Sequence, residues 1–224
     1  MTIIALAGDA GVGKDTFANV LIKDHDYTRV ALADPLRWLC SKTFKLNYDL
    51  FSDNDKKDEE LPDGQLALDF HHIDKIRELI SSEWGYEVSY KIREEMEEYE
   101  GEEFDTPREI LRFVGTKLMR NLVSNDIWIE LAIDKIRKTG GNIIITDCRF
   151  ENERDTFRRF GALMILIKKE LEAEDEGEHD LGDEDDYDVV FSNNGTLHEF
   201  KSNVNMWYTI RKNELSLYKV FKYE

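Results

Sequence analysis

Five short, mainly apolar runs are separated along the chain by amphipathic segments, and this alternation predicts the fold class. The runs have the length and the β-branched content of buried strands. They cover residues 3–7, 28–32, 142–146, 162–167 and 189–191. Because strands alternate with helices, we expect an α/β fold with a mainly parallel, doubly wound sheet flanked by helices.

Between these runs, apolar residues recur every three or four positions, as they do on one face of a helix. The expected helices cover about residues 14–24, 34–44, 72–83, 88–99, 106–122, 126–138, 150–160 and 196–217. Two of them begin with a threonine followed three residues later by a glutamate, at Thr106–Glu109 and Thr196–Glu199. This spacing is a capping box, so both helix starts are well marked.

Acidic residues are concentrated in two segments of a chain whose formal net charge is −18. Residues 53–105 hold 19 acidic and 6 basic residues, and residues 170–188 hold 12 acidic residues and no lysine or arginine. The remainder therefore carries +7. Both acidic segments would repel a long polyanion, which disfavours nucleic acid as a partner but not a small phosphorylated substrate.

The charge pattern and the length of 224 residues predict one domain over residues 1–224. Its core is expected at 1–44 and 106–224, with an acidic helical insertion over about 45–105 and an acidic loop over about 170–188. No membrane-spanning or signal-type apolar run is present, so we expect a cytoplasmic protein without a membrane partner, in the host cytoplasm if a phage encodes it.

Metal-ligand spacings are absent from the cysteines and histidines. Cys40 and Cys148 are far apart in the sequence, which indicates neither a disulfide framework nor a zinc site. His71 and His72 are adjacent instead of one helical turn apart, which is poor geometry for a metal. We therefore interpret the two histidines as surface residues.

Residues 8–16 follow the first apolar run and read Gly-Asp-Ala-Gly-Val-Gly-Lys-Asp-Thr. Glycines between a buried strand and a helix let backbone N–H groups wrap a polyphosphate, and Lys14 can bridge the terminal phosphates. The alternative is a glycine-rich turn without a ligand, but strand, glycines, lysine and helix occur together. The expected ATP-binding residues are Gly8, Ala10, Gly11, Val12, Gly13, Lys14, Asp15 and Thr16.

Asp15 occupies the place where the phosphate-loop pattern usually has the serine or threonine that holds magnesium, and Thr16 follows one place later. Either residue is therefore a candidate metal ligand. A second candidate centre lies at the end of the strand 142–146, where Asp147 and Arg149 follow. Parallel strand ends converge, so Asp147 is placed to coordinate magnesium or orient a substrate; capping of the next helix is its alternative role.

Several separated blocks resemble the phage-type deoxynucleoside monophosphate kinases, within the P-loop group of nucleoside monophosphate kinases. The blocks are Gly-Lys-Asp-Thr at 13–16, Ala-Asp-Pro-Leu-Arg at 33–37, Thr-Pro-Arg-Glu-Ile-Leu at 106–111 with Gly115-Thr116 and Arg120, Asp-x-Arg-x-x-x-Glu at 147–153, and Asn-Asn-Gly-Thr-Leu at 193–197. The resemblance implies a P-loop kinase fold and Mg²⁺-dependent transfer of the ATP γ-phosphate to a deoxynucleoside monophosphate. The products would be ADP and a deoxynucleoside diphosphate for DNA synthesis.

The resemblance also implies roles for individual residues. Lys14, Asp147, Arg149 and Glu153 are the expected catalytic residues, with Glu153 holding Arg149 through a salt bridge. The expected substrate-binding residues are Asp34, Arg37, Arg108, Arg120, Trp128 and Asp147. Capping explains Asp34 about as well.

Related kinases have an arginine-bearing lid where this chain has its acidic loop. Without lysine or arginine there, Arg149, or Arg154, Arg158 and Arg159 on the adjoining helix, become the expected cations for ATP. His179 in the same loop is expected to be exposed. Two other functions stay open: a P-loop kinase of another small metabolite, of the dephospho-coenzyme A or nucleoside type, and a nucleotide-binding regulator that acts through its acidic surface. Base preference and homodimer formation stay open as well.

Overall fold

The computed structural model describes residues 1–53, 55–170 and 181–215, and the chain divides into two compact units. The sheet unit comprises residues 1–32 and 132–224, and the helical unit comprises residues 33–131. The helical unit thus begins before, and ends after, the insertion expected over residues 45–105. Helix α7 (Ile127–Thr139) runs across the second boundary.

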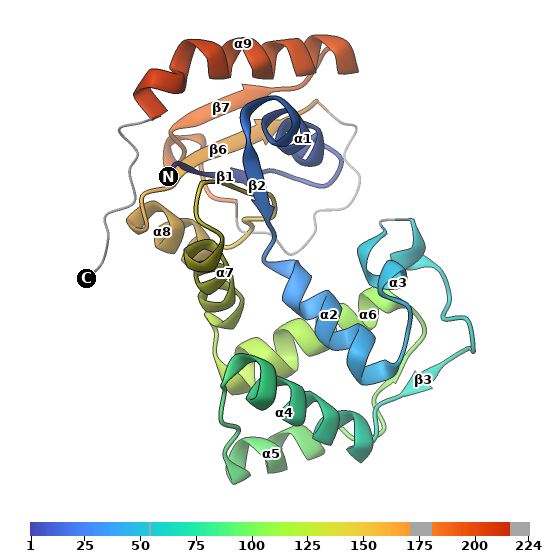
Figure 1. Ribbon diagram of the computed structural model, residues 1–224. Coiled ribbons are helices and arrows are strands. Elements are labelled where there is room, and N and C mark those ends of the chain that lie inside the picture. Colours follow the sequence, from blue (N-terminus) through green and yellow to red (C-terminus); the bar gives the residue numbers. More distant parts are fainter. Residues whose placement is uncertain (54, 171–180, 216–224) are drawn as a thin grey trace. The chain divides into compact units, whose positions relative to one another are not determined.

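The sheet unit contains a five-stranded sheet (Figure 1), and its strands are hydrogen-bonded in the order β2-β5-β1-β6-β7. Its strands are β1 (Ile3–Ala7), β2 (Tyr27–Val30), β5 (Asn142–Ile145), β6 (Leu163–Lys168) and β7 (Val189–Ser192). Every neighbouring pair is parallel, which confirms the predicted α/β class. Strand β2 ends two residues before the expected limit of its apolar run.

Helices lie on both faces of this sheet. Successive side chains of each strand point to opposite faces, so each strand can pack against helices on both sides. Ile4 and Leu6 of β1 belong to a core that also contains Phe17 of α1 (Lys14–His25) and Phe200 of α9 (Leu197–Leu215). Helix α8 (Glu151–Arg159) lies on the opposite side of the sheet from α9 (Figure 1). The loop from β1 to α1 therefore begins at the central strand of the sheet.

The helical unit consists mainly of short helices around an apolar centre. These are α2 (Ala33–Phe44), α3 (Tyr48–Ser52), the 3₁₀ turn η1 (Lys56–Asp58), α4 (Phe70–Trp84), α5 (Tyr90–Glu97) and α6 (Pro107–Arg112). A two-stranded antiparallel pair, β3 (Leu66–Ala67) and β4 (Glu103–Phe104), joins the segment before α4 to the segment after α5. The helices expected over 72–83 and 88–99 are confirmed, whereas this pair was not expected.

The helix expected over 106–122 does not stay α-helical. It begins as α6 and continues as an eleven-residue π-helix, η2 (Phe113–Val123). Gly115 of η2 lies against α2, where a Cβ atom would come within 2.7 Å of Leu36 Cδ2. Apolar periodicity did not reveal the wider turn because both kinds of helix keep one apolar face over so short a stretch.

His72 has a structural role that the surface interpretation missed. Its Nδ1 accepts a hydrogen bond from the Asp69 backbone N–H at 3.2 Å, while Asp69 Oδ1 accepts one from the His72 backbone N–H at 2.9 Å. The pair is a capping box at the start of α4. Burial lowers the pKa of His72, and its ring lies 4.7 Å from that of Phe44. Among the described residues, no group of three or more histidine, cysteine or carboxylate side chains is arranged to hold a metal.

Candidate functional site

Residues 8–16 form the turn between β1 and α1, and three of its glycines adopt backbone angles that other residues avoid. Gly8, Gly11 and Gly13 have φ values of 136°, 73° and 105°. A Cβ atom on Gly8 would come within 2.3 Å of the Ile167 carbonyl oxygen. Both the left-handed angles and the close approach of β6 require glycine here, so the turn has the form of a cradle lined by backbone.

Lys14, the first residue of α1, folds back over this cradle. Its Nζ donates hydrogen bonds to the carbonyl oxygens of Gly8 at 2.7 Å and Asp9 at 2.5 Å. Burial is the main cause that lowers the pKa of Lys14, and the positive charge of Arg149 adds to it. Asp15, Asp9 and Asp147 act in the opposite direction. The ammonium group is thus partly desolvated beside a second cation, a setting that favours an incoming anion.

Asp147 follows β5 and lies at the same sheet edge as the glycine-rich turn. β5 pairs with both β1 and β2. The Asp147 Oδ1 atom accepts a hydrogen bond from the Leu32 backbone N–H at 2.9 Å, just beyond β2. The Cys148 N–H donates to the Leu6 carbonyl of β1 at 3.2 Å. These contacts fix the residues after β5 against both neighbouring strands, and the charge of Asp147 acts on Lys14.

Glu153 organises the backbone that carries Arg149. Its side chain is 2% exposed, and Oε2 accepts hydrogen bonds from the N–H groups of Arg149 at 2.7 Å and Phe150 at 3.1 Å. Sequence reasoning expected a salt bridge to the Arg149 guanidinium. The hydrogen bonds hold the Arg149 main chain at the start of α8, the Arg149 side chain is exposed, and the salt bridge stays a prediction.

Asp15 and Thr16 lie in the first turn of α1, Asp15 exposed and Thr16 half-buried. Magnesium usually takes one or two protein oxygens together with substrate phosphates and water, so these two residues fit such a site. Within the described part of the chain, no group of three or more metal-binding side chains adds to them. Their placement leaves both as candidate ligands. Ala10 and Gly11, at the tip of the turn, are exposed.

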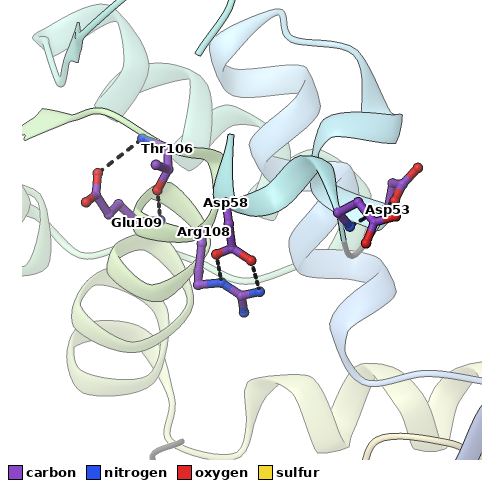
Figure 2. A network of polar contacts seen from close by, with 6 residues as sticks. Asp53, Asp58, Thr106, Arg108 and Glu109 are labelled. Atoms are coloured by element: carbon purple, nitrogen blue, oxygen red, sulfur yellow. Dashed lines mark hydrogen bonds and ion pairs between the residues drawn. The ribbon is translucent and has the colours of Figure 1, made fainter. Parts of the chain in front are cut away.

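In the helical unit, two of the expected substrate-binding arginines pair with carboxylates. Arg37 donates through Nη1 to Asp34 Oδ1 at 2.9 Å, one turn away on α2. Arg108, at the start of α6, forms a two-pronged contact with Asp58 of η1 (Figure 2). Its Nη2 lies 2.7 Å from Asp58 Oδ2. The hydrogen bond from Arg108 lowers the pKa of Asp58.

Figure 2 also shows the capping box that presents Arg108. Thr106 Oγ1 accepts from the Glu109 N–H at 3.3 Å, and Glu109 Oε2 accepts from the Thr106 N–H at 3.1 Å. This confirms the helix start read from the sequence. Because the box fixes the first turn of α6, the Arg108 backbone is fixed as well.

Arg120 and Trp128 lie elsewhere in the helical unit. Arg120 is half-buried on η2. Trp128 is only 4% exposed, and its indole Nε1 donates to the Gly115 carbonyl at 3.3 Å. Its ring meets that of Trp84 at 6.0 Å, and Trp84 meets Trp38 at 5.9 Å. Trp128 is thus a packed core residue in this structure.

The end of the acidic loop is held by cations of the sheet unit. Arg158 of α8 donates to the Asp186 carbonyl, and Lys168 Nζ lies 2.5 Å from Glu184 Oε1. Arg154 is 4% exposed and lies beside Gly182. Two of the cations considered for ATP therefore contact this loop, while Arg159 is exposed. Residues 171–180, including His179, lie outside the described residues.

A residue of this region that sequence reasoning left without a role is Asn193. Its Nδ2 donates to the Val12 carbonyl of the glycine-rich turn at 2.8 Å. The sequence signals were the turn propensity of Ser192-Asn193-Asn194-Gly195 and the resemblance block at 193–197, and neither specifies a distant partner. In the part of the chain that the structure describes, no helix combines the length and apolar character needed to cross a membrane.

Comparisons with known proteins are consistent with this geometry. Residues 62–204 match the family described as "Deoxynucleotide monophosphate kinase". The chain is 26% identical over 222 residues to the "Putative deoxynucleotide monophosphate kinase" of Acanthamoeba polyphaga mimivirus, covering 91% of this chain and 94% of that protein. It is 30% identical over 179 residues to the "Deoxynucleoside-5'-monophosphate kinase" of Escherichia phage T5, covering 70% of this chain and 71% of that protein.

Proposed function

The chain belongs to the deoxynucleotide monophosphate kinase family, and we propose that it transfers the γ-phosphate of ATP to a deoxynucleoside monophosphate, giving ADP and the diphosphate. The observation that carries the proposal is the arrangement at one sheet edge: Lys14 folds over the glycine cradle after β1, and Asp147 and Arg149 follow the neighbouring strand β5. Phosphoryl transfer depends mainly on positioning and on charge stabilisation, which such a group supplies.

In the proposed reaction, an oxygen of the acceptor phosphate forms a bond to the γ-phosphorus, and the bond from that phosphorus to the β,γ-bridging oxygen breaks as ADP leaves. The acceptor oxygen is already anionic near neutral pH, so no strong general base is required. Lys14 leaves the two loop carbonyls and binds the terminal phosphates, together with the N–H groups of the cradle. Arg149 neutralises charge on the transferred group, and Asp147 orients the acceptor.

Magnesium, when bound, would be held by Asp15 or Thr16 and would neutralise phosphate charge. Glu153 acts through Arg149 by holding its main chain. On the acceptor side, we propose Arg37, Arg108 and Arg120 as ligands of the monophosphate. Arg37 and Arg108 would share their donors between the substrate and their present carboxylate partners.

We further propose that the enzyme acts on free nucleotides in the cytoplasm and not on nucleic acid. The acidic segment of residues 53–105 supports this, because its carboxylates disfavour a polyanion more than a mononucleotide. Sedimentation at assay concentrations measures whether the enzyme forms a homodimer.

The direct test is a coupled assay of ADP release with MgATP and each of dAMP, dCMP, dGMP and dTMP, with the diphosphate product identified by chromatography. We expect turnover of at least one monophosphate and its loss when EDTA removes magnesium. Deoxynucleosides and dephospho-coenzyme A serve as the competing acceptors. The proposal would be contradicted if folded protein phosphorylates none of the four monophosphates. It would also be contradicted if the protein prefers dephospho-coenzyme A as acceptor.

A further inference from the structure

Asn193 lies in the turn between β7 and α9, yet its side chain reaches the loop between β1 and α1. Its Nδ2 donates to the Val12 carbonyl at 2.8 Å across 181 positions of sequence. The Asn193 backbone is fixed as well, because its N–H donates to the Lys168 carbonyl at the end of β6 at 2.8 Å. The amide group is thus held from the sheet and directed at one peptide of the cradle.

That contact determines which way the next N–H of the cradle points. The carbonyl of Val12 and the N–H of Gly13 belong to one trans peptide, so they point in opposite directions. When Asn193 holds the Val12 oxygen on its own side, the Gly13 N–H is directed away from Asn193. N–H groups of successive loop residues that are fixed in this way form an anion site without reorganising on binding.

Gly13 shows how closely the asparagine approaches. A Cβ atom on Gly13 would come within 2.6 Å of Asn193 Nδ2 and 3.3 Å of Phe200 Cε1. Two features therefore require glycine at this position: the φ of 105° and the close approach of the Asn193 side chain. The neighbouring Asn194 has a different partner, accepting a hydrogen bond from the Glu170 N–H through Oδ1 at 3.0 Å.

We propose that Asn193 is a positioning residue for ATP: it orients the Val12–Gly13 peptide so that the cradle meets the nucleotide phosphates with its N–H groups already aligned. The inference rests on the proposed function, since it requires that residues 8–16 bind the phosphate donor. It assigns Asn193 no contact with either substrate. Loss of the contact weakens ATP binding and leaves the acceptor site unchanged.

The test compares Asn193→Ala and Asn193→Asp with the control Asn194→Ala, using titration calorimetry with a non-hydrolysable ATP analogue plus Mg²⁺ and, separately, steady-state kinetics for the best dNMP. Asn193→Ala should raise the Kd for the analogue about tenfold, the usual effect of losing one positioned hydrogen bond. The KM for dNMP should stay within about twofold. Asn194→Ala should match the wild type in both measurements.

Asn193→Asp gives the signature that a purely structural role would not produce. At neutral pH the new carboxylate can only accept, so it repels the Val12 carbonyl and should raise the Kd by more than the alanine variant does. At pH 5, part of the new group is a carboxylic acid that can donate, and the Kd relative to wild type at the same pH should fall. The alanine variant should show no such recovery.

The outcomes separate this inference from the function on which it rests. If the wild type binds no ATP analogue and turns over no dNMP, the proposed function fails. If the wild type binds and both Asn193 variants bind equally well, this inference alone fails. It also fails if the Kd for the analogue and the KM for dNMP rise together with a lowered Tm, since that result indicates general loss of structure.

Discussion

Lys14 of the sheet unit and two arginines of the helical unit have opposite kinds of hydrogen-bond partner. Lys14 is hydrogen-bonded to two uncharged carbonyl oxygens, and the charge of Arg149 opposes its protonation. Arg37 and Arg108 each donate to a carboxylate, on Asp34 and Asp58. An anion that reaches Lys14 replaces neutral acceptors, whereas one that reaches Arg108 competes with an existing negative charge.

This difference suggests two separate tasks. A cation held by neutral groups beside a second cation gains much from an arriving phosphate, which suits the stabilisation of transferred charge. An arginine that already has a carboxylate gains less, which suits reversible binding of an acceptor. Substitutions of the cationic residues Lys14 and Arg149 in the sheet unit should therefore act mainly on kcat, and those of the helical-unit arginines mainly on the KM for dNMP.

The largest effect is expected for Lys14. Lys14→Ala should lower kcat about 10³-fold, because it removes a donor aligned with the transferred phosphoryl group. The coupled ADP-release assay measures this, with Lys23→Ala as the matched control, since Lys23 is an exposed lysine in the last turn of the same helix. A kcat for Lys14→Ala within tenfold of the wild type would remove the proposed role of the cradle.

Arg108 and Asp58 provide the corresponding test in the helical unit. Arg108→Ala should raise the KM for dNMP about tenfold to a hundredfold with little change in the KM for ATP, because a charged hydrogen-bond donor to the acceptor is lost. Asp58→Asn should lower the KM for dNMP a few-fold, since it removes the competing charge.

The control for this pair is Lys75→Ala, which breaks an exposed ion pair with Glu78 on α4 and should change neither KM. If Asp58→Asn raises the KM for dNMP as Arg108→Ala does, then Asp58 supports Arg108 in the substrate complex instead of competing with the substrate. The contrast between the two units would then be weaker than the structure suggests.

The effect of pH on ATP binding should be smaller than the effects of these substitutions. Burial and Arg149 lower the pKa of Lys14, so the free enzyme loses this charge at a lower pH than an ordinary lysine does. Lysine is protonated below its pKa, so the affinity for the ATP analogue is highest there and falls as pH rises through that value. The total fall is about tenfold for each unit by which binding raises the pKa of Lys14.

Calorimetry between about pH 7 and pH 10 measures this fall, and proton uptake should accompany binding at the alkaline end. Lys14→Arg is the control, because a guanidinium stays protonated throughout this range. If Lys14→Arg shows the same loss of affinity as the wild type, another group titrates and the lowered pKa of Lys14 is not its cause.

The sheet unit was largely predictable from the sequence, and the reasons are local. Most of its strands lie in largely apolar runs, and the cradle residues adjoin one another in the chain. Asp147 could be placed because parallel strands bring their ends to one edge. The Asn193 contact could not be predicted, since a hydrogen bond across 181 positions depends on how the β7–α9 turn packs on the cradle.

The helical unit was less predictable because its contacts are non-local and its elements short. β3 and β4 contain two residues each, too few for a visible alternation. The Arg108–Asp58 pair joins residues 50 positions apart, and neither residue is unusual in its local sequence. The hydrogen bond from the Trp128 indole N–H to the Gly115 carbonyl is likewise visible only in the fold, and its expected substrate contact stays a prediction.

The smallest expected effects concern the two threonine caps, one in each unit. Thr106→Ala and Thr196→Ala should each lower the free energy of unfolding by about 1 kcal/mol, the usual contribution of such a cap. Thr196 Oγ1 accepts from the Glu199 N–H at 3.2 Å, close to the 3.3 Å of the bond in the other box. Urea unfolding of both single variants and the double variant measures the losses.

The two losses should add, because the boxes share no hydrogen-bond partner among those described. Thr106→Ala should also raise the KM for dNMP slightly, since Arg108 lies in the turn that this cap fixes, whereas Thr196→Ala should not. If Thr196→Ala alone changes the KM for dNMP, the division of tasks between the two units is wrong, because a change in the sheet unit would then act on acceptor binding.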